Sequence, residues 1–371
     1  MKMKPNWIVL LVCMLAHPLG AADTADKIAA LSLPEGFTLS LVTDKVPNAR
    51  QMALSPQGIL YVGTRKAGNV YAVLPAQNRD DPEVIVIASD LTMPSGVAFI
   101  DGDLYVGAVD RVLKYSNIDL DLKRNSQTEL TAEVVSEDLP DKSHHGWKSL
   151  SVGSDGYLYV PVGVPCNICL SDNPMFGTIQ RMHPDTGVLS TYARGVRNSV
   201  GLAWHPVSGN MWFSDNGRDM LGEDVPSDEI NEISKENAHY GYPFFHAGDI
   251  ADPEFGKGKK AADYIPPVHK IQAHSAALGI SFYEGNQFPQ KYHNALFIAE
   301  HGSWNRKEKV GYRVSVIRWE NGDKIYEPFI TGWLNGEKNW GRPNDVLVTP
   351  DGDLLVSDDQ AGAIYRISYN R

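Results

Sequence analysis

Two adjacent histidines in a short polar segment are the first residues in this sequence that could do chemistry. His144 and His145 lie in Ser-His-His-Gly-Trp-Lys, residues 143–148. The unperturbed pKa of histidine, about 6.5, suits a general base near neutral pH when the side chain faces a channel. In a surface loop the same pair would only pack or contact solvent. The segment therefore predicts a candidate base, with a structural role as the alternative.

A second polar region, residues 195–232, combines cations, amides and carboxylates. Arg197 and Asn198 come first, and seven carboxylates with one arginine, Arg218, lie in the stretch from Asp215 to Glu232. Such density is typical of a solvated acidic loop, but Ca²⁺ also prefers about six to eight oxygen ligands. The spacing is not that of an EF-hand loop. We expect a solvated loop or a site for a hard cation, with the side chains of 228–231 bracing the loop before them.

Tryptophan and arginine come together in two segments near the carboxyl end. Residues 300–306 contain His301 and Trp304, and residues 340–345 contain Arg342 and Asn344. An indole ring offers a flat stacking face, and a guanidinium group binds a carboxylate through two hydrogen bonds. The pair is also common on ordinary surfaces. These residue types predict a site for an anionic, planar, aromatic ligand.

Charge and missing motifs exclude several classes of partner. The chain has 34 Lys and Arg against 45 Asp and Glu, a formal net charge of -11. This balance disfavours binding to a phosphate backbone, so no nucleic acid partner is expected. The sequence contains no serine nucleophile elbow, dinucleotide fingerprint or P-loop, which disfavours nucleotide cofactors.

The first 22 residues have the pattern of a secretory signal peptide. Lys2 and Lys4 precede an apolar run over residues 7–16, and small residues follow at 20–22. The run is shorter than the ~20 residues that span a bilayer, and no later segment approaches that length. An uncleaved anchor is the alternative. We expect residues 1–22 to be removed, leaving a periplasmic or secreted protein with no membrane span.

Outside the predicted signal peptide the sequence has two cysteines, Cys166 and Cys169, spaced as C-x-x-C. In an oxidising compartment such a pair is most simply a local disulfide that closes a loop. A redox-active pair is the alternative, although the thioredoxin-like strand and helix setting is missing. A zinc site would need two further ligands, which are not nearby in the sequence.

A turn followed by a short apolar strand recurs six times and organises the whole chain. The six copies are residues 56–63, 101–107, 155–160, 208–214, 293–298 and 351–357. A second apolar strand follows each copy, over residues 69–73, 111–115, 178–182, 229–233, 313–318 and 363–368. Asp, Asn and Gly tolerate the positive φ of tight turns, while Tyr, Val, Ile and Leu suit a pleated, half-buried surface. The pattern predicts six β-hairpins.

Six such units suit a β-propeller. They share residues 23–371, which gives about 58 residues per unit, within the range of four-stranded blades with their loops. We predict an all-β, six-bladed β-propeller of four-stranded antiparallel blades, as a single domain. Two β-sandwiches are the alternative, but they would need a linker, and the sequence has no Pro/Gly/Ser-rich or charge-biased boundary. Residues 244–271 are predicted as a loop insertion over one face, and residues 27–33 as a short amphipathic helix.

The order of these motifs resembles the glucose/sorbosone dehydrogenase family, soluble six-bladed propellers that use pyrroloquinoline quinone (PQQ). The resemblance covers nearly the whole of residues 23–371. It rests on the histidine loop, Arg197-Asn198 with 201–203, residues 215–217 and 228–231, and Tyr-Gly-Tyr-Pro at 240–243. Residues 299–306, 311–312 and 341–343, with the Cys166 and Cys169 pair, are similar to the sorbosone dehydrogenase-like branch.

The resemblance implies a role for each motif residue. His145 is implied to be the general base, and Arg197 and Asn198 to contact the quinone. Arg197 is also implied to be catalytic, because with Ca²⁺ it would polarise a quinone carbonyl. The backbone carbonyls of Gly217 and Arg218 are implied to ligate Ca²⁺. Arg342 would bind a carboxylate of PQQ, and His301, Trp304 and Asn344 complete the expected cofactor-binding set.

The implied reaction is oxidation of a sugar, an aldose or a sorbosone-like compound, with electrons passed to an acceptor that the sequence does not name. Residues 93–97 lack the glutamine of glucose-oxidising relatives, so the sugar stays open, as does the oligomeric state. Two other classes compete on the same fold: a Ca²⁺-dependent lactonase-type hydrolase and a non-enzymatic binding module. A module would scatter His145, Arg197 and Arg342, whereas an enzyme needs them to face one channel.

Overall fold

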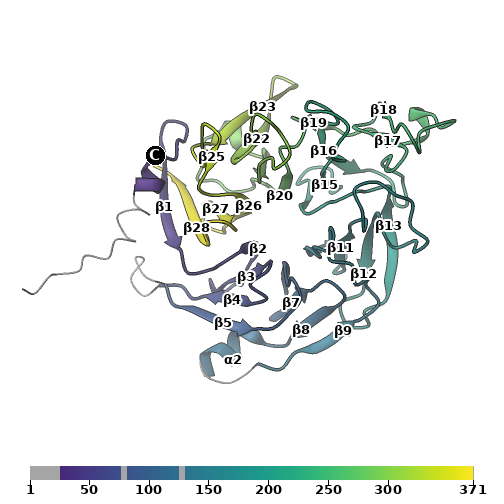
Figure 1. Cartoon of the computed structure of the whole chain (residues 1–371). Helices are drawn as coiled ribbons and strands as arrows, with labels where there is room; N and C mark the ends of the chain where they lie inside the picture. Colours follow the sequence, from purple (N-terminus) through teal and green to yellow (C-terminus); the bar gives the residue numbers. More distant parts are fainter. Residues whose placement is uncertain (1–25, 77–81, 125–129, 371) are drawn as a thin grey trace, which may run out of the picture.

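Six four-stranded antiparallel sheets are arranged as blades around a central axis in this computed structural model (Figure 1). The structure describes residues 26–76, 82–124 and 130–370, so the predicted signal peptide at 1–22 lies outside the described residues. This architecture confirms the predicted six-bladed β-propeller.

The first five blades are continuous in sequence, and the strands of each hydrogen-bond in chain order. Blades 1 to 3 are formed by β2 (Ala49–Leu54), β3 (Leu60–Thr64), β4 (Val70–Val73) and β5 (Val84–Ala88); β6 (Gly96–Ile100), β7 (Asp103–Gly107), β8 (Val112–Tyr115) and β9 (Glu133–Ser136); and β10 (Ser151–Val152), β11 (Leu158–Val162), β12 (Thr178–Met182) and β13 (Leu189–Arg194). Blades 4 and 5 are formed by β14 (Leu202–Trp204), β15 (Met211–Asp215), β16 (Asp228–Ile233) and β19 (His269–Ile271); and β20 (Ala277–Phe282), β21 (Leu296–Glu300), β22 (Arg313–Glu320) and β23 (Asp323–Ile330).

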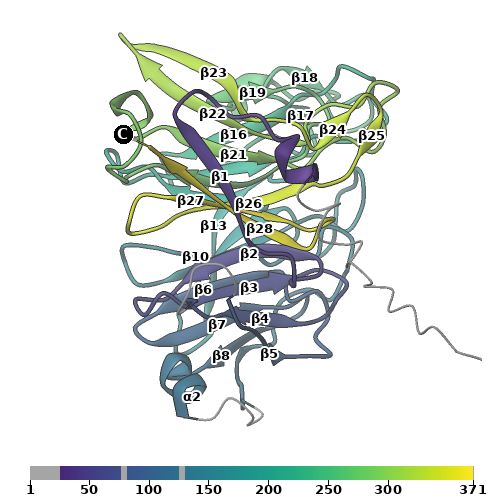
Figure 2. The same ribbon diagram turned by 90° about the vertical axis from the view of Figure 1, so that its left-hand side faces the viewer.

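The sixth blade closes the ring with strands from both ends of the chain. It contains β26 (Pro343–Val348), β27 (Leu354–Asp358) and β28 (Ala363–Tyr369), and its outer strand is β1 (Phe37–Thr43). β1 runs antiparallel to β28, with Phe37 opposite Tyr369, and Figure 2 shows the two strands side by side. Phe37 packs edge-on against Phe288 and Phe329, which adds an aromatic contact to the closure.

The six predicted hairpins are the second and third strands of the six blades. Leu354 at the start of β27 pairs with Ile367 of β28, for example, and Leu158 of β11 pairs with Met182 of β12. The second strand of each blade is almost wholly buried, because each sheet packs between two neighbours. Tight turns rich in Gly and Asp, followed by apolar residues, were therefore a sound signal for the hairpins.

The helical expectation was wrong at its carboxyl end. Residues 26–29 are helical, but a turn follows at Ala30, and Ser32 forms a β-bridge with Thr331. Backbone hydrogen bonds between Ser32 and Thr331, in both directions, replace the helical ones. A seven-residue helix that was not predicted, α2 (Ile118–Arg124), connects β8 to β9.

Two small hairpins extend the loops between blade strands. β17 (Phe245–His246) pairs with β18 (Ile250–Ala251) between the third and fourth strands of blade 4, and β24 (Leu334–Asn335) pairs with β25 (Lys338–Asn339) between blades 5 and 6. The predicted insertion, 244–271, thus contains β17, β18 and η1 (Ala261–Asp263), and it ends in blade strand β19. A second 3-10 turn, η2 (Gln290–Tyr292), precedes β21.

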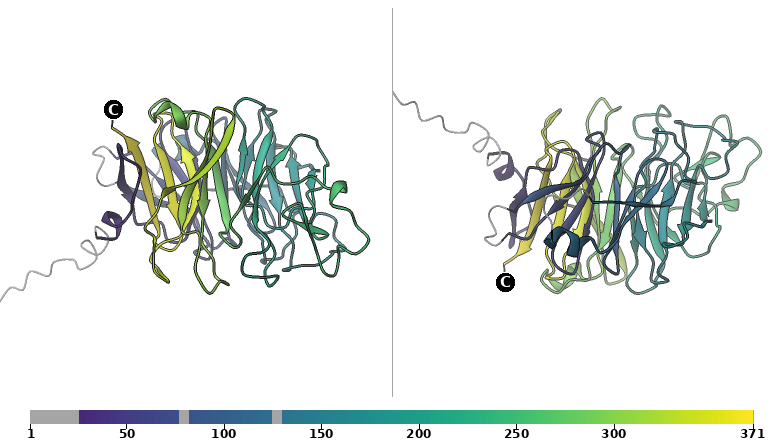
Figure 3. Two further views of the ribbon diagram at one scale, coloured as in Figure 1. Left: turned by 90° about the horizontal axis from the view of Figure 1, so that it is seen from above. Right: turned by 90° about the horizontal axis from the view of Figure 1, so that it is seen from below.

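The innermost strands of the blades surround the central axis. A cavity of about 300 Å³ is lined by residues of β2, β6, β10, β14, β20 and β26. Blades approach closely there: a Cβ on Gly96 would lie 1.8 Å from the carbonyl oxygen of Lys148, so only glycine fits. Figure 3 views the ring from its edge, with strands running between two faces that carry the loops. Within the described residues no helix is long and apolar enough to cross a bilayer.

Candidate active site

One face of the ring carries a cavity of about 370 Å³ that is lined by polar loop residues. Each of these loops either enters an innermost strand or leaves the second strand of a blade. The two positions meet because neighbouring strands are antiparallel, as Ala277 at the start of β20 opposite Glu300 at the end of β21 illustrates. Most of the predicted site residues line this cavity: His145, Arg197, Asn198, Gly217, His301, Trp304 and Arg342.

His145 precedes the innermost strand of blade 3 and is held by the exit of β11. Its Nδ1 lies 2.9 Å from the carbonyl oxygen of Val164. A carbonyl can only accept, so Nδ1 carries the proton and the lone pair remains on Nε2. Burial first, and then the charges of Arg197 and His144, lower the pKa of His145 to about 2. The imidazole is therefore neutral at ordinary pH.

The backbone around His145 is shaped to bring the ring close to blade 3. His145 itself has φ 49°, in the left-handed region that non-glycine residues rarely adopt. A Cβ on Gly163 would lie 2.6 Å from the carbonyl oxygen and 2.7 Å from the Cβ of His145. Glycine at 163 is what permits this approach.

Arg197 is buried and its guanidinium group is held by three acceptors of the neighbouring loops. Nε donates to the carbonyl oxygen of Asn167 at 2.9 Å, Nη2 to Oδ1 of the same residue at 2.9 Å, and Nη1 to the carbonyl oxygen of Asn216 at 3.1 Å. Asp219 lies 3.4 Å from Nη2. Burial lowers the pKa of Arg197, while Asp219 and Asp215 oppose that shift. The side chain thus brings a fixed positive charge to the cavity.

Two buried aspartates brace the loops on this side of the cavity. Asp215 accepts from the backbone N–H groups of Arg197 at 2.8 Å and Asn198 at 2.6 Å. Asp228 accepts from the backbone N–H groups of Gly217 at 2.8 Å and Ala276 at 2.7 Å. The prediction that residues 228–231 brace the preceding loop is confirmed for Asp228. Burial raises the pKa of Asp228 to about 7, against the backbone hydrogen bonds that favour its charged form.

A second group of cations lies on the other side of the cavity, and sequence reasoning missed most of it. Arg50 and Arg65 both stack on Trp147, with centroid distances of 4.9 and 4.8 Å. Arg50 pairs with Asp359 at 2.8 Å, and Nε2 of His301 lies 2.8 Å from the same carboxylate. Burial lowers the pKa of Arg50 to about 10 and that of His301 to about 4.

Arg342 completes this group. Its Nε donates to the carbonyl oxygen of His301 at 3.0 Å, and its guanidinium group lies over the ring of Tyr312. Asn344, predicted to bind cofactor, is not among the lining residues of the cavity. In the amide orientation that satisfies both partners, its side-chain oxygen accepts from Nη1 of Arg50 at 2.8 Å. Asn344 therefore hydrogen-bonds Arg50 and does not itself line the cavity.

The predicted metal-ligating residues, Gly217 and Arg218, differ in whether they line the cavity. Gly217 lines the cavity, whereas the Arg218 side chain turns outward to Asp252, which also accepts from His246. Among residues 26–76, 82–124 and 130–370, no three His, Cys, Asp or Glu side chains are grouped to hold a metal ion. Any cation at this position would depend on backbone carbonyls.

The rim of the cavity carries Trp304 and Asn305. The indole of Trp304 is 69% exposed, so it is available to a ligand. Asn305 donates to the Asp219 carboxylate at 2.6 Å, which holds Asp219 between Asn305 and Arg197. Asp219 and Asn305 were not predicted, although both lie inside segments that the sequence had singled out.

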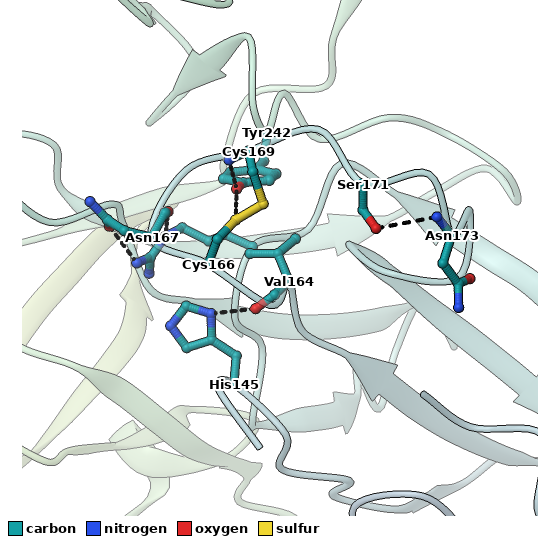
Figure 4. Close-up of a disulfide and its surroundings, with 9 residues drawn as sticks. His145, Val164, Cys166, Asn167, Cys169, Ser171, Asn173 and Tyr242 are labelled. Atoms are coloured by element: carbon teal, nitrogen blue, oxygen red, sulfur yellow. Dashed lines mark hydrogen bonds between the residues drawn. A yellow bond between two sulfur atoms is a disulfide. The ribbon is translucent and has the colours of Figure 1, made fainter. Parts of the chain in front are cut away.

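The Cys166 and Cys169 pair forms a disulfide beside the site, which confirms the predicted local bridge. Figure 4 shows the loop that it closes, with the ring of His145 turned toward Val164 and with Asn167 on the same loop. The phenol oxygen of Tyr242 accepts from the backbone N–H of Cys169 at 2.9 Å.

Comparisons with known proteins agree with this architecture. A family model described as TrAA12-like matches residues 31–370. An uncharacterised protein of Borreliella burgdorferi is 32% identical over 360 residues, which cover 94% of this chain and 93% of that protein. The aldose sugar dehydrogenase of Escherichia coli is 30% identical over 182 residues, 48% of this chain and 43% of that enzyme.

A solved structure supports the fold. The holo form of the PQQ domain of pyranose dehydrogenase from Coprinopsis cinerea superposes with a TM-score of 0.73 at 17% identity, covering 91% of this chain and 97% of that domain. The sorbosone dehydrogenase-like branch stays a prediction. The match over residues 31–370 means that this chain belongs to the TrAA12-like family of β-propellers related to PQQ-dependent sugar dehydrogenases.

Proposed function

We propose that this protein is an exported quinoprotein dehydrogenase that oxidises a sugar, an aldose or a sorbosone-like aldehyde or alcohol, with PQQ as cofactor and Ca²⁺ as its partner. One observation carries the proposal. His145, Arg197 and Arg342 enter three different blades, 3, 4 and 6, and line the same cavity. A base and two cations from distant parts of the chain are thus available to one ligand.

The chemistry of the cavity fits PQQ, which bears three carboxylates. Arg50, Arg65, Arg197 and Arg342 all line it, although the protein as a whole is acidic. Among the described residues, the buried atoms Nε of Arg65 and Oδ1 of Asn198 have no hydrogen-bond partner in the protein. Buried polar atoms normally find one, so a ligand with both acceptors and a donor would satisfy them. Arg342, Arg50 and Arg65 would bind carboxylates, while Arg197 and Asn198 would contact the quinone.

The roles of the protein's own residues follow from the geometry. When bound, PQQ supplies a two-electron acceptor for the carbon that bears the substrate hydroxyl. Nε2 of His145 holds a lone pair and would accept the hydroxyl proton. The fixed charge of Arg197 would favour negative charge that develops at the centre of the cavity. Trp304, exposed at the rim, would offer an apolar face to the sugar ring.

Ca²⁺ is proposed at the backbone carbonyls of Gly217 and Arg218. Asp228 accepts from the Gly217 N–H, and this contact fixes the peptide that immediately precedes the Gly217 carbonyl. Carbonyl oxygens are ligands that Ca²⁺ accepts, and the nearby carboxylates of Asp215 and Asp228 add negative charge.

The two competing classes receive less support. A lactonase would need acidic side chains at the channel that are available to a metal, but both oxygens of Asp215 and of Asp228 already accept backbone N–H groups. A binding module would not require a base and two cations to share one cavity with a neutral, oriented histidine.

Export is proposed from the leader pattern at 1–22 and from the disulfide, which persists in oxidising compartments. The mature protein would work in the periplasm or outside the cell, where it would meet its sugar and pass electrons to an acceptor that is still to be identified.

The test is to add PQQ to the purified apo-protein, with and without Ca²⁺, and to follow the quinone absorption spectrum before and after an aldose. We expect saturable, Ca²⁺-dependent binding and bleaching by the sugar. Arg342→Ala should weaken PQQ binding at least 10-fold, and His145→Ala should retain binding but lose bleaching. Arg181→Gln removes an arginine that pairs with Asp155, away from the cavity, and is the matched control. Failure of the wild-type protein to bind PQQ at any Ca²⁺ concentration would refute the proposal.

A further inference from the structure

A single loop, residues 164–169, contacts both residues to which the proposed reaction assigns chemistry. Its first residue, Val164, accepts from Nδ1 of His145, and its backbone N–H donates to the carbonyl oxygen of Arg197 at 3.0 Å. Its fourth residue, Asn167, accepts from Nε and Nη2 of the Arg197 guanidinium group. The loop thus orients the base and the cation together.

Asn167 also binds the backbone of Asp219, whose carboxylate lies near the Arg197 guanidinium group. Its Oδ1 accepts from the backbone N–H of Asp219 at 2.8 Å, and its Nδ2 donates to the carbonyl oxygen of Asp219 at 3.0 Å. The side-chain amide therefore satisfies the backbone of Asp219 in both directions while its oxygen binds Arg197. Few residue types other than Asn offer one acceptor and one donor on so short a side chain.

The disulfide fixes the position of Asn167. Cys166 precedes it and Cys169 lies two residues after it, so the bridge closes a four-residue ring around it. Tyr242 ties this ring to the next loop through the Cys169 N–H. A closed ring of this size leaves the Asn167 backbone few conformations, and the Asn167 carbonyl is the acceptor for Arg197 Nε.

We infer that Asn167 is a positioning residue for Arg197, and that the Cys166–Cys169 disulfide is the part of the site that holds Asn167 in place. The inference rests on the proposed function for its catalytic meaning, but the placement of Arg197 can be measured without cofactor. A dithiol reductant would open the ring by passing two electrons and two protons to the cysteines and becoming a cyclic disulfide itself. The open loop would release Asn167, and Arg197 would lose its two acceptors there.

The first experiment compares Asn167→Ala with Asn173→Ala in the apo-protein. Asn173 follows this loop in the same connection between β11 and β12, is exposed, and accepts from the Met175 N–H instead of from the site, so it is a matched control. We would follow the Nε–H resonance of Arg197, assigned with Arg197→Lys, and its exchange with water. In Asn167→Ala we expect a shifted resonance and at least 10-fold faster exchange, in a protein that circular dichroism shows to be folded. A wild-type resonance in Asn167→Ala would overturn the inference.

The second experiment titrates PQQ in the presence of Ca²⁺. We expect Asn167→Ala to bind PQQ about 10-fold more weakly and Asn173→Ala to bind it as the wild type does. If the wild-type protein binds no PQQ, the proposed function fails, and the Arg197 resonance alone decides the positioning role. If PQQ binds equally to wild type and Asn167→Ala, the positioning role is refuted while the proposed function stands.

The third experiment tests the disulfide. Reduction of the folded protein with a dithiol, confirmed by counting thiols, should move the Arg197 resonance toward that of Asn167→Ala and weaken PQQ binding by a similar factor. Cys166→Ser with Cys169→Ser should do the same, and the reduced wild type replaces it if this double variant does not fold. A fully reduced protein with wild-type resonance and affinity would overturn the role of the disulfide.

Discussion

Nδ1 of His145 donates to the carbonyl oxygen of Val164 across 2.9 Å, and this one contact decides which ring nitrogen is left with a lone pair. The backbone of His145 adopts φ 49° to make it, a conformation that costs a non-glycine residue about 1 kcal/mol or more. Strain of this kind persists only where surrounding contacts impose it. The neutral, oriented imidazole is therefore a property of the fold rather than of a bound ligand.

The depressed pKa of His145 should make stability depend on pH. Its pKa is about 2 in the folded protein, because of burial first and then Arg197, and about 6.5 in an unfolded chain. Between these values the unfolded chain binds a proton that the folded protein does not. The contribution to stability is therefore complete above about pH 6.5 and is lost as the pH falls, by about 1.4 kcal/mol per unit.

The measurement is denaturant unfolding of the wild type and His145→Gln at pH 7.5, 6.5 and 5.5. Other groups titrate equally in both proteins, so the difference between them isolates His145. We expect the free energy of unfolding of the wild type to fall relative to that of the variant below about pH 6.5. A difference that does not change over this range would show that the pKa of His145 is not lowered in the folded protein.

Replacing Arg50 should destabilise the protein more than replacing Arg65, although both side chains stack on Trp147. Arg50 is buried and pairs with a buried carboxylate, so Arg50→Ala would leave Asp359 hydrogen-bonded to neutral His301 but without its ion-pair partner, at a cost of about 3–5 kcal/mol. Arg65 is half-buried, and Arg65→Ala should cost less than about 1 kcal/mol. Both variants should weaken PQQ binding. Thermal unfolding and a PQQ titration of each protein test the pair, and equal losses of stability would contradict the assignment of Asp359 to Arg50.

The hairpins of the fold could be predicted because their signal is local. An Asp-Gly or Asn turn followed by three or four apolar residues carries its own geometry, as in the turn before Leu354 of β27. The innermost strands could not be found in this way. β10 has only two residues, Ser151 and Val152, too few for any period, and it forms because neighbouring blades bring it against β11. The helical expectation for 27–33 failed for a similar reason, since Thr331, distant in sequence, pairs with Ser32.

The candidate site was predicted where a motif marks it and missed where only topology does. His145, Arg197 and Arg342 lie in recognisable segments, and the structure brings them to one cavity. Arg50 and Arg65 lie in no motif. Yet Arg50 is at the start of the innermost strand β2, and Arg65 directly follows the second strand β3. Those are the positions of the other lining residues, so the six-fold repeat itself could have identified both arginines.

Gly163→Ala should reduce activity more than it reduces the stability of the fold. The added Cβ would lie 2.6–2.7 Å from atoms of His145, which must move away from Val164. We expect at least a 10-fold loss of sugar-dependent quinone bleaching with PQQ affinity reduced much less, because the arginines are not displaced. Gly258→Ala has φ +77° but no atom within 4 Å of the new Cβ, so it reports backbone strain alone, about 1 kcal/mol. Bleaching at the wild-type rate in Gly163→Ala would contradict the role of His145.

Arg218→Gln separates the backbone role proposed for this residue from the role of its side chain. The guanidinium group pairs with Asp252, whose buried carboxylate also accepts from His246 and from the N–H groups of Glu254 and Phe255. Loss of the cation leaves that carboxylate with fewer partners. The insertion around β17 and β18 should therefore be less stable by about 1–3 kcal/mol and should be cut faster by a protease under native conditions.

Ca²⁺ affinity, measured by calorimetry with PQQ present, should stay the same or rise, because the proposed ligand is the carbonyl oxygen and a nearby positive charge is removed. Glu254→Gln changes an exposed carboxylate of the same insertion and should alter neither measurement. A large loss of Ca²⁺ affinity in Arg218→Gln without faster proteolysis would mean that the side chain itself supports the cation site.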